Sequence, residues 1–417
     1  MNSEELALAA LGWIESVAVT DGDGVCWGET PGSPEEDPTL YQGAAGIVLT
    51  LVEAHAHLGD RRWAELAERG MSGLARSLDA CYAPGDAGLY GGASGMAFAL
   101  QAAADWADPA VAALGRAAAA RAMEGVRSGF DGERWDGFTD LLIGNAGIAL
   151  AALAMGDVEL AETAVVPFLR TAEVTAYGQT WETRRGEARR LHHMSHGTLG
   201  VAYALAAVGA AAGRADLIDA ALAGTADVTA RNEAGPDGFL VQYSEPEVPH
   251  PRRERISYGW CHGPAGDAQL FRLLARLDAG GRAAEWTELS DRCWTTLTTC
   301  GLPAPLRPGF WDNSGHCCGT AGVLALALDR AAEGQDGLAF ADVLVADIAR
   351  RATVDATGAR WSNLEHRDSP PELEPRTGWA MGSAGVIREL LRHARLTDGR
   401  DPAYAVQWPD QPVASAR

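Results

Sequence analysis

Apolar residues recur along most of the chain at spacings of three and four, the pattern of amphipathic helices. The alternation of single apolar and polar residues that is typical of strands is nearly absent. A nearly all-apolar run such as residues 46–59 (GIVLTLVEAHAHLG) is usually followed by a charged amphipathic run such as residues 61–78 (RRWAELAERGMSGLARSL). A helix that is apolar all round is covered on every side, whereas a helix with one polar face lies at the surface. The pattern therefore predicts two alternating classes of helix.

A glycine motif, G-x-x-G, precedes each of the apolar runs and repeats along the chain. Its copies begin at Gly43, Gly92, Gly144, Gly197, Gly263, Gly319 and Gly382, and the second glycines are Gly46, Gly95, Gly147, Gly200, Gly266, Gly322 and Gly385. Successive copies lie roughly 50 to 65 residues apart, which is room for two helices and their loops. Because glycine has no Cβ, we expect it to permit close backbone packing and a positive φ in the loop that enters each helix.

The repeat predicts an all-α fold, an α/α toroid of about seven inner and seven outer helices that forms a single domain over residues 1–417. The opening segment, residues 3–17, is expected to supply an outer helix that closes the ring against the last repeat. Residues directly before the glycines then gather at the N-termini of the inner helices. Unpaired N–H groups at these N-termini favour negative charge, so we expect the functional residues to lie directly before the glycines.

The charge of the chain excludes one class of function. A formal net charge of −22 argues against nucleic acid as a partner, because binding to phosphates needs a basic surface. Two basic patches, residues 181–190 (WETRRGEARR) and 249–255 (PHPRRER), are local exceptions. They suit either an acidic peptide or a phosphate, or else they form ordinary solvated surface.

Location follows from what the sequence lacks. The first residues carry early acids and no continuous apolar core of a signal peptide, and no run reaches the length of a membrane span. We therefore expect a cytoplasmic protein with no membrane span. In that compartment thiols stay reduced, so clustered cysteines indicate a metal or catalytic site rather than disulfides.

Three of the seven cysteines share the register of the glycine repeat. Cys261 and Cys317 each lie two residues before the first glycine of adjacent copies, and Cys318 follows directly. Ring closure would bring the three together, where they suit Zn²⁺ with a fourth position left open; the alternative is three buried free thiols. His262 and His316 are competing ligand candidates. The remaining cysteines are expected to be inert and mostly buried, and they are Cys26, Cys81, Cys293 and Cys300.

The motifs WCHG (260–263), HCCGTAG (316–322) and TGWAMGSAG (377–385), together with the seven repeats, resemble the lanthionine synthetase C-like proteins. The resemblance covers about residues 41–391 and is to the free-standing form. It implies a zinc-dependent addition of a cysteine thiol to dehydroalanine or dehydrobutyrine, with a dehydrated precursor peptide as substrate and a dehydratase as a candidate partner. It places the zinc ligands at Cys261, Cys317 and Cys318. Most members of the family carry His at the last of these positions, so that Cys318 indicates a three-cysteine subgroup.

The same resemblance assigns two catalytic positions, Asp140 and His196. A group must take the thiol proton and another must protonate the enolate, and histidine suits this by its pKa. The structural alternatives are a helix cap for Asp140 and a packing role for His196. One departure is Ser257, which stands where many of these cyclases carry arginine, so that Arg255 becomes a candidate replacement.

Other functions use the same features. Addition of a small thiol such as glutathione to dehydroamino acids needs the same site and a different substrate. A zinc-stabilised peptide-binding module would need the metal without turnover. A prenyltransferase-like toroid also activates a thiol on zinc, but the repeat register holds no obvious lysine and arginine pocket for a diphosphate.

Overall fold

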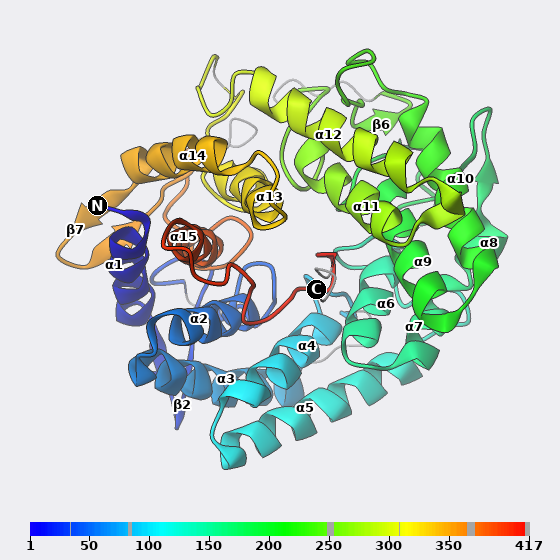
Figure 1. The fold of residues 1–417 in the computed structure, drawn as a ribbon. Helices are drawn as coiled ribbons and strands as arrows, with labels where there is room; N and C mark the ends of the chain where they lie inside the picture. The colour runs from blue at the N-terminus through cyan, green and yellow to red at the C-terminus, as the bar shows by residue number, and fades with distance from the viewer. Residues whose placement is uncertain (34, 82–85, 248–253, 308, 365–371, 413–417) are drawn as a thin grey trace. The chain divides into compact units, whose positions relative to one another are not determined.

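Helices dominate the protein, and the strands of its described residues form short two-stranded antiparallel ribbons, in the computed structural model (Figure 1). The structure describes residues 1–33, 35–81, 86–247, 254–307, 309–364 and 372–412, with backbone alone at 79–81. The chain divides into two compact units. Unit 1 contains Met1–Tyr82, Gly95–Met123 and Leu302–Val406, and unit 2 contains Ala83–Ser94, Glu124–Gly301 and Gln407–Arg417.

Unit 1 is built on three largely buried helices, of which α15 packs against the other two (Figure 1). They are α2 (Ala44–Leu58), α13 (Thr320–Ala332) and α15 (Ser383–Thr397). Each packs against a partner helix that carries an exposed polar face. The partners are α3 (Arg61–Cys81), α14 (Leu338–Arg351) and α1 (Ser3–Ser16) respectively. The alternation of covered and half-exposed helices is the one that the sequence predicts.

Unit 2 repeats this arrangement, with α9 packed between α6 and α11. These largely buried helices are α6 (Asn145–Ala154), α9 (Thr198–Ala212) and α11 (Pro264–Arg276). Their partners are α7 (Val158–Val165), α10 (Ala215–Thr229) and α12 (Ala283–Thr299), with a short α8 (Phe168–Thr171) after α7. Two further helices, α4 (Ala93–Ala103) and α5 (Pro109–Ser128), contain residues of both units.

The strands form four ribbons between helices. The pairs are β1 (Val19–Asp21) with β2 (Gly24–Cys26), β3 (Glu173–Val174) with β4 (Gln179–Thr180), β5 (Arg190–Leu191) with β6 (Ser244–Glu245), and β7 (Thr353–Asp355) with β8 (Gly358–Arg360). The β5–β6 ribbon joins segments on either side of α9 and α10. It thereby places the residues after β5 and before β6 beside each other, at the site described below.

The first glycine of every motif directly precedes an apolar helix, as predicted, but the expected positive φ is wrong. Gly43 and Gly263 have φ of −129° and −171°, which is extended backbone that any residue adopts. Close packing explains the glycines instead. A Cβ at Gly43 would lie 1.8 Å from the carbonyl oxygen of Asp37, and one at Gly266 would lie 1.9 Å from that of Trp260. Any side chain would push the helix away from the turn that precedes it.

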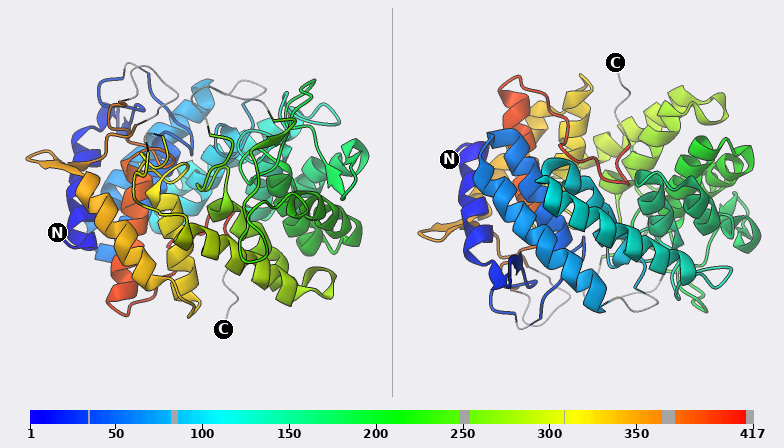
Figure 2. Two further views of the ribbon diagram at one scale, coloured as in Figure 1. Left: turned by 90° about the horizontal axis from the view of Figure 1, so that it is seen from above. Right: turned by 90° about the horizontal axis from the view of Figure 1, so that it is seen from below.

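The N-terminal helix packs where the sequence predicts, along the last apolar helix. In Figures 1 and 2 the dark blue α1 lies beside the orange-red α15, and the two helices are in contact. The Ser3 hydroxyl and Nδ1 of His393 share a hydrogen bond of 2.8 Å across this contact. A capping box between Asn2 and Glu5 fixes the start of α1.

Candidate functional site

In unit 2 the turns before the glycine motifs are joined by hydrogen bonds. The backbone N–H and the hydroxyl of Ser195 both donate to the carbonyl oxygen of Cys261, at 3.1 and 2.9 Å. The carbonyl oxygen of Ser195 in turn accepts the N–H of Leu141 at 3.2 Å. Residues before α6, α9 and α11 are therefore fixed next to one another, although about 60 residues separate successive turns in sequence.

His196 and Asp140 are brought together by this arrangement. Nδ1 of His196 lies 2.6 Å from Oδ2 of Asp140. The Asp140 side chain is fully buried, whereas that of His196 is 31% exposed. Because the carboxylate accepts the Nδ1 proton, the lone pair of the neutral ring is on Nε2. The pair thus has the form of a base oriented by a buried acid.

Asp140 also has the structural role that the sequence left open. Its Oδ1 accepts the backbone N–H groups of Ile143 and Gly144, at 2.8 and 3.2 Å, so that the carboxylate closes the turn that leads into α6. One oxygen therefore holds the backbone and the other holds His196. The two readings of Asp140, turn cap and partner of a catalytic base, are compatible.

His262 extends the cluster in unit 2. Its ring stacks on that of His196, with centroids 5.5 Å apart and planes inclined by 24°. Nε2 of His262 shares a hydrogen bond of 2.7 Å with the hydroxyl of Tyr243, which directly precedes β6. The β5–β6 ribbon therefore holds a tyrosine hydroxyl against a histidine that covers one face of His196.

Cys317 and Cys318 lie in unit 1, directly before α13. Their Sγ atoms are 3.5 Å apart, and the Tyr41 hydroxyl donates to Sγ of Cys317 at 3.0 Å. Cys317 is buried and Cys318 is half-buried. Cys261 occupies the equivalent position before α11 in unit 2 and is also buried. Thiols at a helix N-terminus are favoured in their thiolate form by the unpaired N–H groups there.

His316, one of the competing ligand candidates, lies in a buried part of unit 1. Its ring packs on Trp379 with centroids 4.2 Å apart, and its Nδ1 lies 3.9 Å from Oε1 of Glu389. Burial, reinforced by the charge of Arg388, lowers the pKa of His316 to about 3. Burial likewise raises the pKa of Glu389 to about 7. His316 is therefore a neutral ring over the working range of pH.

Two cysteines outside the motif register are buried, as expected. Burial raises the pKa of Cys26 to about 12, and that of Cys293 well above the ordinary value. Cys300 is half-buried and its thiol donates to the carbonyl oxygen of Leu297. The side chain of Cys81 lies outside the described residues. A raised pKa keeps the thiol protonated and hence unreactive.

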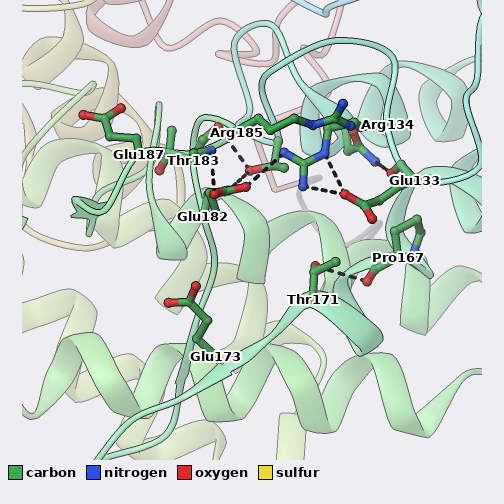
Figure 3. A network of polar contacts seen from close by, with 12 residues as sticks. Glu133, Arg134, Pro167, Thr171, Glu173, Glu182, Thr183, Arg185 and Glu187 are labelled. Carbon is green, nitrogen blue, oxygen red and sulfur yellow. Dashed lines mark hydrogen bonds and ion pairs between the residues drawn. The ribbon is translucent and has the colours of Figure 1, made fainter.

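The first basic patch is neutralised largely by its own neighbours. Arg185 pairs with Asp131 at 3.3 Å, and Arg189 pairs with Glu187 at 2.8 Å. Figure 3 shows the polar network beside it, in which Arg134 is held by two carboxylates. These carboxylates belong to Glu133 and Glu182. The structure favours solvated surface here over an anion site.

The second patch lies mostly outside the described residues. Its last residue, Arg255, is described and donates to the carboxylate of Glu233 at 2.7 Å and to the side chain of Gln242 at 3.1 Å. The arginine that was considered as a replacement at Ser257 is thus engaged in an ion pair.

Comparison with known proteins identifies the family of the chain. The profile of the family described as "Lanthionine synthetase C-like protein" matches residues 34–247 and 247–345. The chain belongs to the lanthionine synthetase C-like family. No curated protein sequence matches it significantly.

Solved structures show the fold of this family member. The structure of nisin cyclase is similar at a TM-score of 0.60 with 16% sequence identity, over 85% of this chain and 88% of that one. An α-1,6-mannanase, GH76A of Salegentibacter sp. HEL1_6, aligns with a TM-score of 0.48 and 11% identity over 95% of this chain and 100% of that one. The predicted fold class, an all-α protein of the α/α toroid type, is confirmed. Among the described residues, no helix combines the length and the apolar character that crossing a membrane requires.

Sequence reasoning missed a second histidine and aspartate pair in this family member. Nδ1 of His193 lies 2.8 Å from Oδ2 of Asp267, and both side chains are buried. A signal existed in the repeat, because Asp267 follows the second glycine, where the other copies carry an apolar residue. Those residues are Ile47, Met96, Ile148, Val201, Val323 and Val386. A charge at a core position needs a buried partner, and that partner is His193.

Proposed function

We propose that this protein is a zinc-dependent cyclase. It adds cysteine thiols to dehydroalanine or dehydrobutyrine within a dehydrated precursor peptide and forms lanthionine or methyllanthionine thioether rings. Membership of the lanthionine synthetase C-like family supports this function, and the fold is shared with a protein named nisin cyclase. The observation that carries the proposal is the placement of the cysteine thiols directly before helices that begin at equivalent glycines.

The donor set fits zinc. Among the described residues, Cys261, Cys317 and Cys318 are the group of ligand-type side chains that could hold a metal ion. Three thiolates are a common zinc-binding set, and they leave one position for the thiol of the substrate. When bound, zinc would lower the pKa of that thiol and hold the sulfur as a nucleophile. We further propose that residues 1–417 form a single domain.

His196 and Asp140 would move the protons. As sulfur attacks the β-carbon, the π electrons of the double bond pass to the α-carbon and its carbonyl, and the resulting enolate takes up one proton. Nε2 of His196 faces away from Asp140 and is the nitrogen free to carry this proton. The buried carboxylate of Asp140 would stabilise the protonated ring and keep it oriented. The net reaction moves one proton from the thiol to the α-carbon.

The test uses a peptide that contains one dehydroalanine and one cysteine. Cyclisation leaves the mass unchanged and consumes the thiol, so the product should resist alkylation, whereas the peptide without enzyme should be alkylated. Excess glutathione separates the two enzymatic functions. A cyclase still gives the unshifted and unalkylated product, and a small-thiol ligase gives the glutathione adduct. A zinc-loaded protein that consumes no thiol above background would indicate a binding module instead.

Metal analysis of variants tests the ligand set. Cys317→Ala should lose both zinc and activity and keep its helical content, because the helix packing does not depend on the ion. Full zinc occupancy in both Cys261→Ala and Cys317→Ala would contradict the assignment.

A further inference from the structure

The hydroxyl of Tyr41 donates a hydrogen bond to the sulfur of Cys317, 3.0 Å away, within unit 1. Tyr41 comes from the turn before α2, whereas Cys317 precedes α13, so 276 positions separate the two in sequence. Both residues lie two positions before the first glycine of their motifs. No sequence motif points to this contact, and the proposed proton transfers do not use it.

The backbone holds this contact in place. The carbonyl oxygen of Tyr41 accepts the N–H of Ala380 at 2.8 Å, and the carbonyl oxygen of Ala380 accepts the N–H of Cys317 at 2.8 Å. The turn itself is tight, because Gly43 leaves no room for a Cβ against Asp37. Three turns are thereby tied together, and their backbone hydrogen bonds hold the main chains of Tyr41 and Cys317 next to each other.

We propose that Tyr41 is a positioning residue that keeps the sulfur of Cys317 a metal ligand and hinders it from acting as a nucleophile. The proposal rests on the function proposed above. The substrate of that reaction is an electrophile, and a shell of thiolates offers it several sulfurs. A hydrogen bond to an ionised acceptor withdraws charge from it. The Tyr41 hydroxyl therefore makes Cys317 less nucleophilic than a substrate sulfur that has no such donor.

The side reaction that Tyr41 would suppress is an addition to the enzyme itself. Sγ of Cys317 would form a bond with the β-carbon of a dehydroalanine, the π electrons would pass to the enolate, and the α-carbon would take up one proton from water. The product is a thioether between enzyme and peptide, and its neutral sulfur is not among the thiolate, imidazole and carboxylate ligands that usually bind zinc in proteins. The addition would inactivate the site.

The experiment compares wild type with Tyr41→Phe, which removes only the hydroxyl. Zinc-loaded proteins are treated with N-ethylmaleimide, which accepts thiolates in the same kind of addition, and modification of Cys317 is followed by peptide mapping. We expect it to be about fivefold faster in Tyr41→Phe, the effect of one net hydrogen bond of ordinary strength. Tyr177→Phe is the control, because Tyr177 lies exposed in the turn between β3 and β4 and should match wild type.

A spectroscopic measurement separates this role from a loss of packing. In cobalt-substituted protein, removal of a hydrogen bond to a ligand sulfur should shift the sulfur-to-cobalt charge-transfer band to lower energy, and only Tyr41→Phe should show the shift. Equal rates of Cys317 modification and identical bands in Tyr41→Phe and wild type would overturn the role of Tyr41 alone. Wild type that binds no zinc would instead overturn the proposed function, and the role of Tyr41 with it.

Discussion

Two histidines on the turn before α9 in unit 2, three residues apart, each pair with an aspartate, and the two pairs differ mainly in exposure. His196 pairs with Asp140 at 2.6 Å and keeps 31% of its side chain exposed. His193 pairs with Asp267 at 2.8 Å, and neither side chain reaches solvent appreciably. In both pairs Nδ1 of the histidine shares a hydrogen bond with Oδ2 of the aspartate, so the two contacts have the same atoms. Exposure to solvent is what separates them.

A histidine–aspartate pair is therefore not by itself evidence of catalysis. The carboxylate of Asp267 lies in a largely buried helix, at a position where the other repeats carry an apolar residue, and it shares a hydrogen bond with Nδ1 of His193 there. The carboxylate of Asp140 lies in a turn, and its histidine projects from the turn before α9. The first pair is closed off from solvent, whereas the second is open to solvent on the side of its histidine.

The largest expected effect is a loss in the free energy of unfolding when the buried pair, His193 and Asp267, is broken. His193→Ala leaves the carboxylate of Asp267 buried without its partner, and such a loss costs about 3–5 kcal/mol in the free energy of unfolding. Urea unfolding of wild type and variant measures the difference. Activity per folded molecule should be close to that of wild type. An unfolding free energy within 1 kcal/mol of wild type, about the cost of an ordinary substitution, would show that the pair is not structural.

The third histidine of the same turn adds a pH dependence. His192 is buried and shares a hydrogen bond of 2.8 Å with the carbonyl oxygen of Gln242, and burial lowers its pKa to about 4. The unfolded chain takes up a proton below about pH 6.5, whereas the folded chain resists it down to about pH 4. Stability is therefore lost as the pH falls through this window, by about 3 kcal/mol in total.

The variant His192→Asn checks this by keeping a hydrogen-bond donor without a titrating ring. Unfolding free energies of both proteins should be measured between pH 7 and pH 4. The wild type should lose about 3 kcal/mol more than the variant over that range. Parallel pH profiles would mean that the pKa of His192 is not lowered in the folded protein.

At the exposed pair the effect is expected on the reaction. His196→Ala should slow thiol addition by on the order of a hundredfold or more, the usual loss when a positioned acid or base is removed. Zinc content and the urea midpoint should stay near those of wild type, because the side chain is partly solvated. If His193→Ala loses as much activity per folded molecule as His196→Ala, exposure does not distinguish the pairs.

The smallest expected effect is on the reaction rate of a variant at Cys318, and it tests the proposed role of this thiol as a zinc ligand. Cys318→His should retain zinc, since imidazole is an ordinary zinc ligand, and should slow the reaction by removing one negative charge from the shell. A reduction of about fivefold is expected for a change of this kind, which corresponds to roughly 1 kcal/mol. A variant as fast as wild type would remove the argument from charge.

The sequence was sufficient for much of this account, and the repeat explains why. Glycine is required wherever one of these helices begins against the preceding turn. The spacing of the glycine motifs therefore located the start of each such helix, and it placed Cys261 and Cys317 at equivalent positions. Asp140 and His196 were singled out through the family resemblance, and the structure pairs them. The reason offered for the glycines was partly wrong, because contact distance and not a positive φ excludes a side chain at Gly43.

Other features depend on contacts that no local pattern encodes. The ribbons have strands of two or three residues, too short to show an alternation. The hydrogen bond of Tyr41 to Cys317 depends on the packing of three turns. The partner of Asp267 could have been sought from its unusual position in the repeat, but the choice of His193 over its neighbours His192 and His196 depends on which ring points into the core.

The central claim is a zinc-dependent addition of a thiol, and one comparison tests it most directly. Thiol loss from the peptide with one dehydroalanine and one cysteine should be followed with zinc-loaded wild type, with the same preparation after removal of the metal, and after zinc is restored. The account predicts ring closure above background with the loaded protein, none with the stripped protein, and recovery on restoring zinc. Equal rates for the loaded and stripped proteins would contradict it.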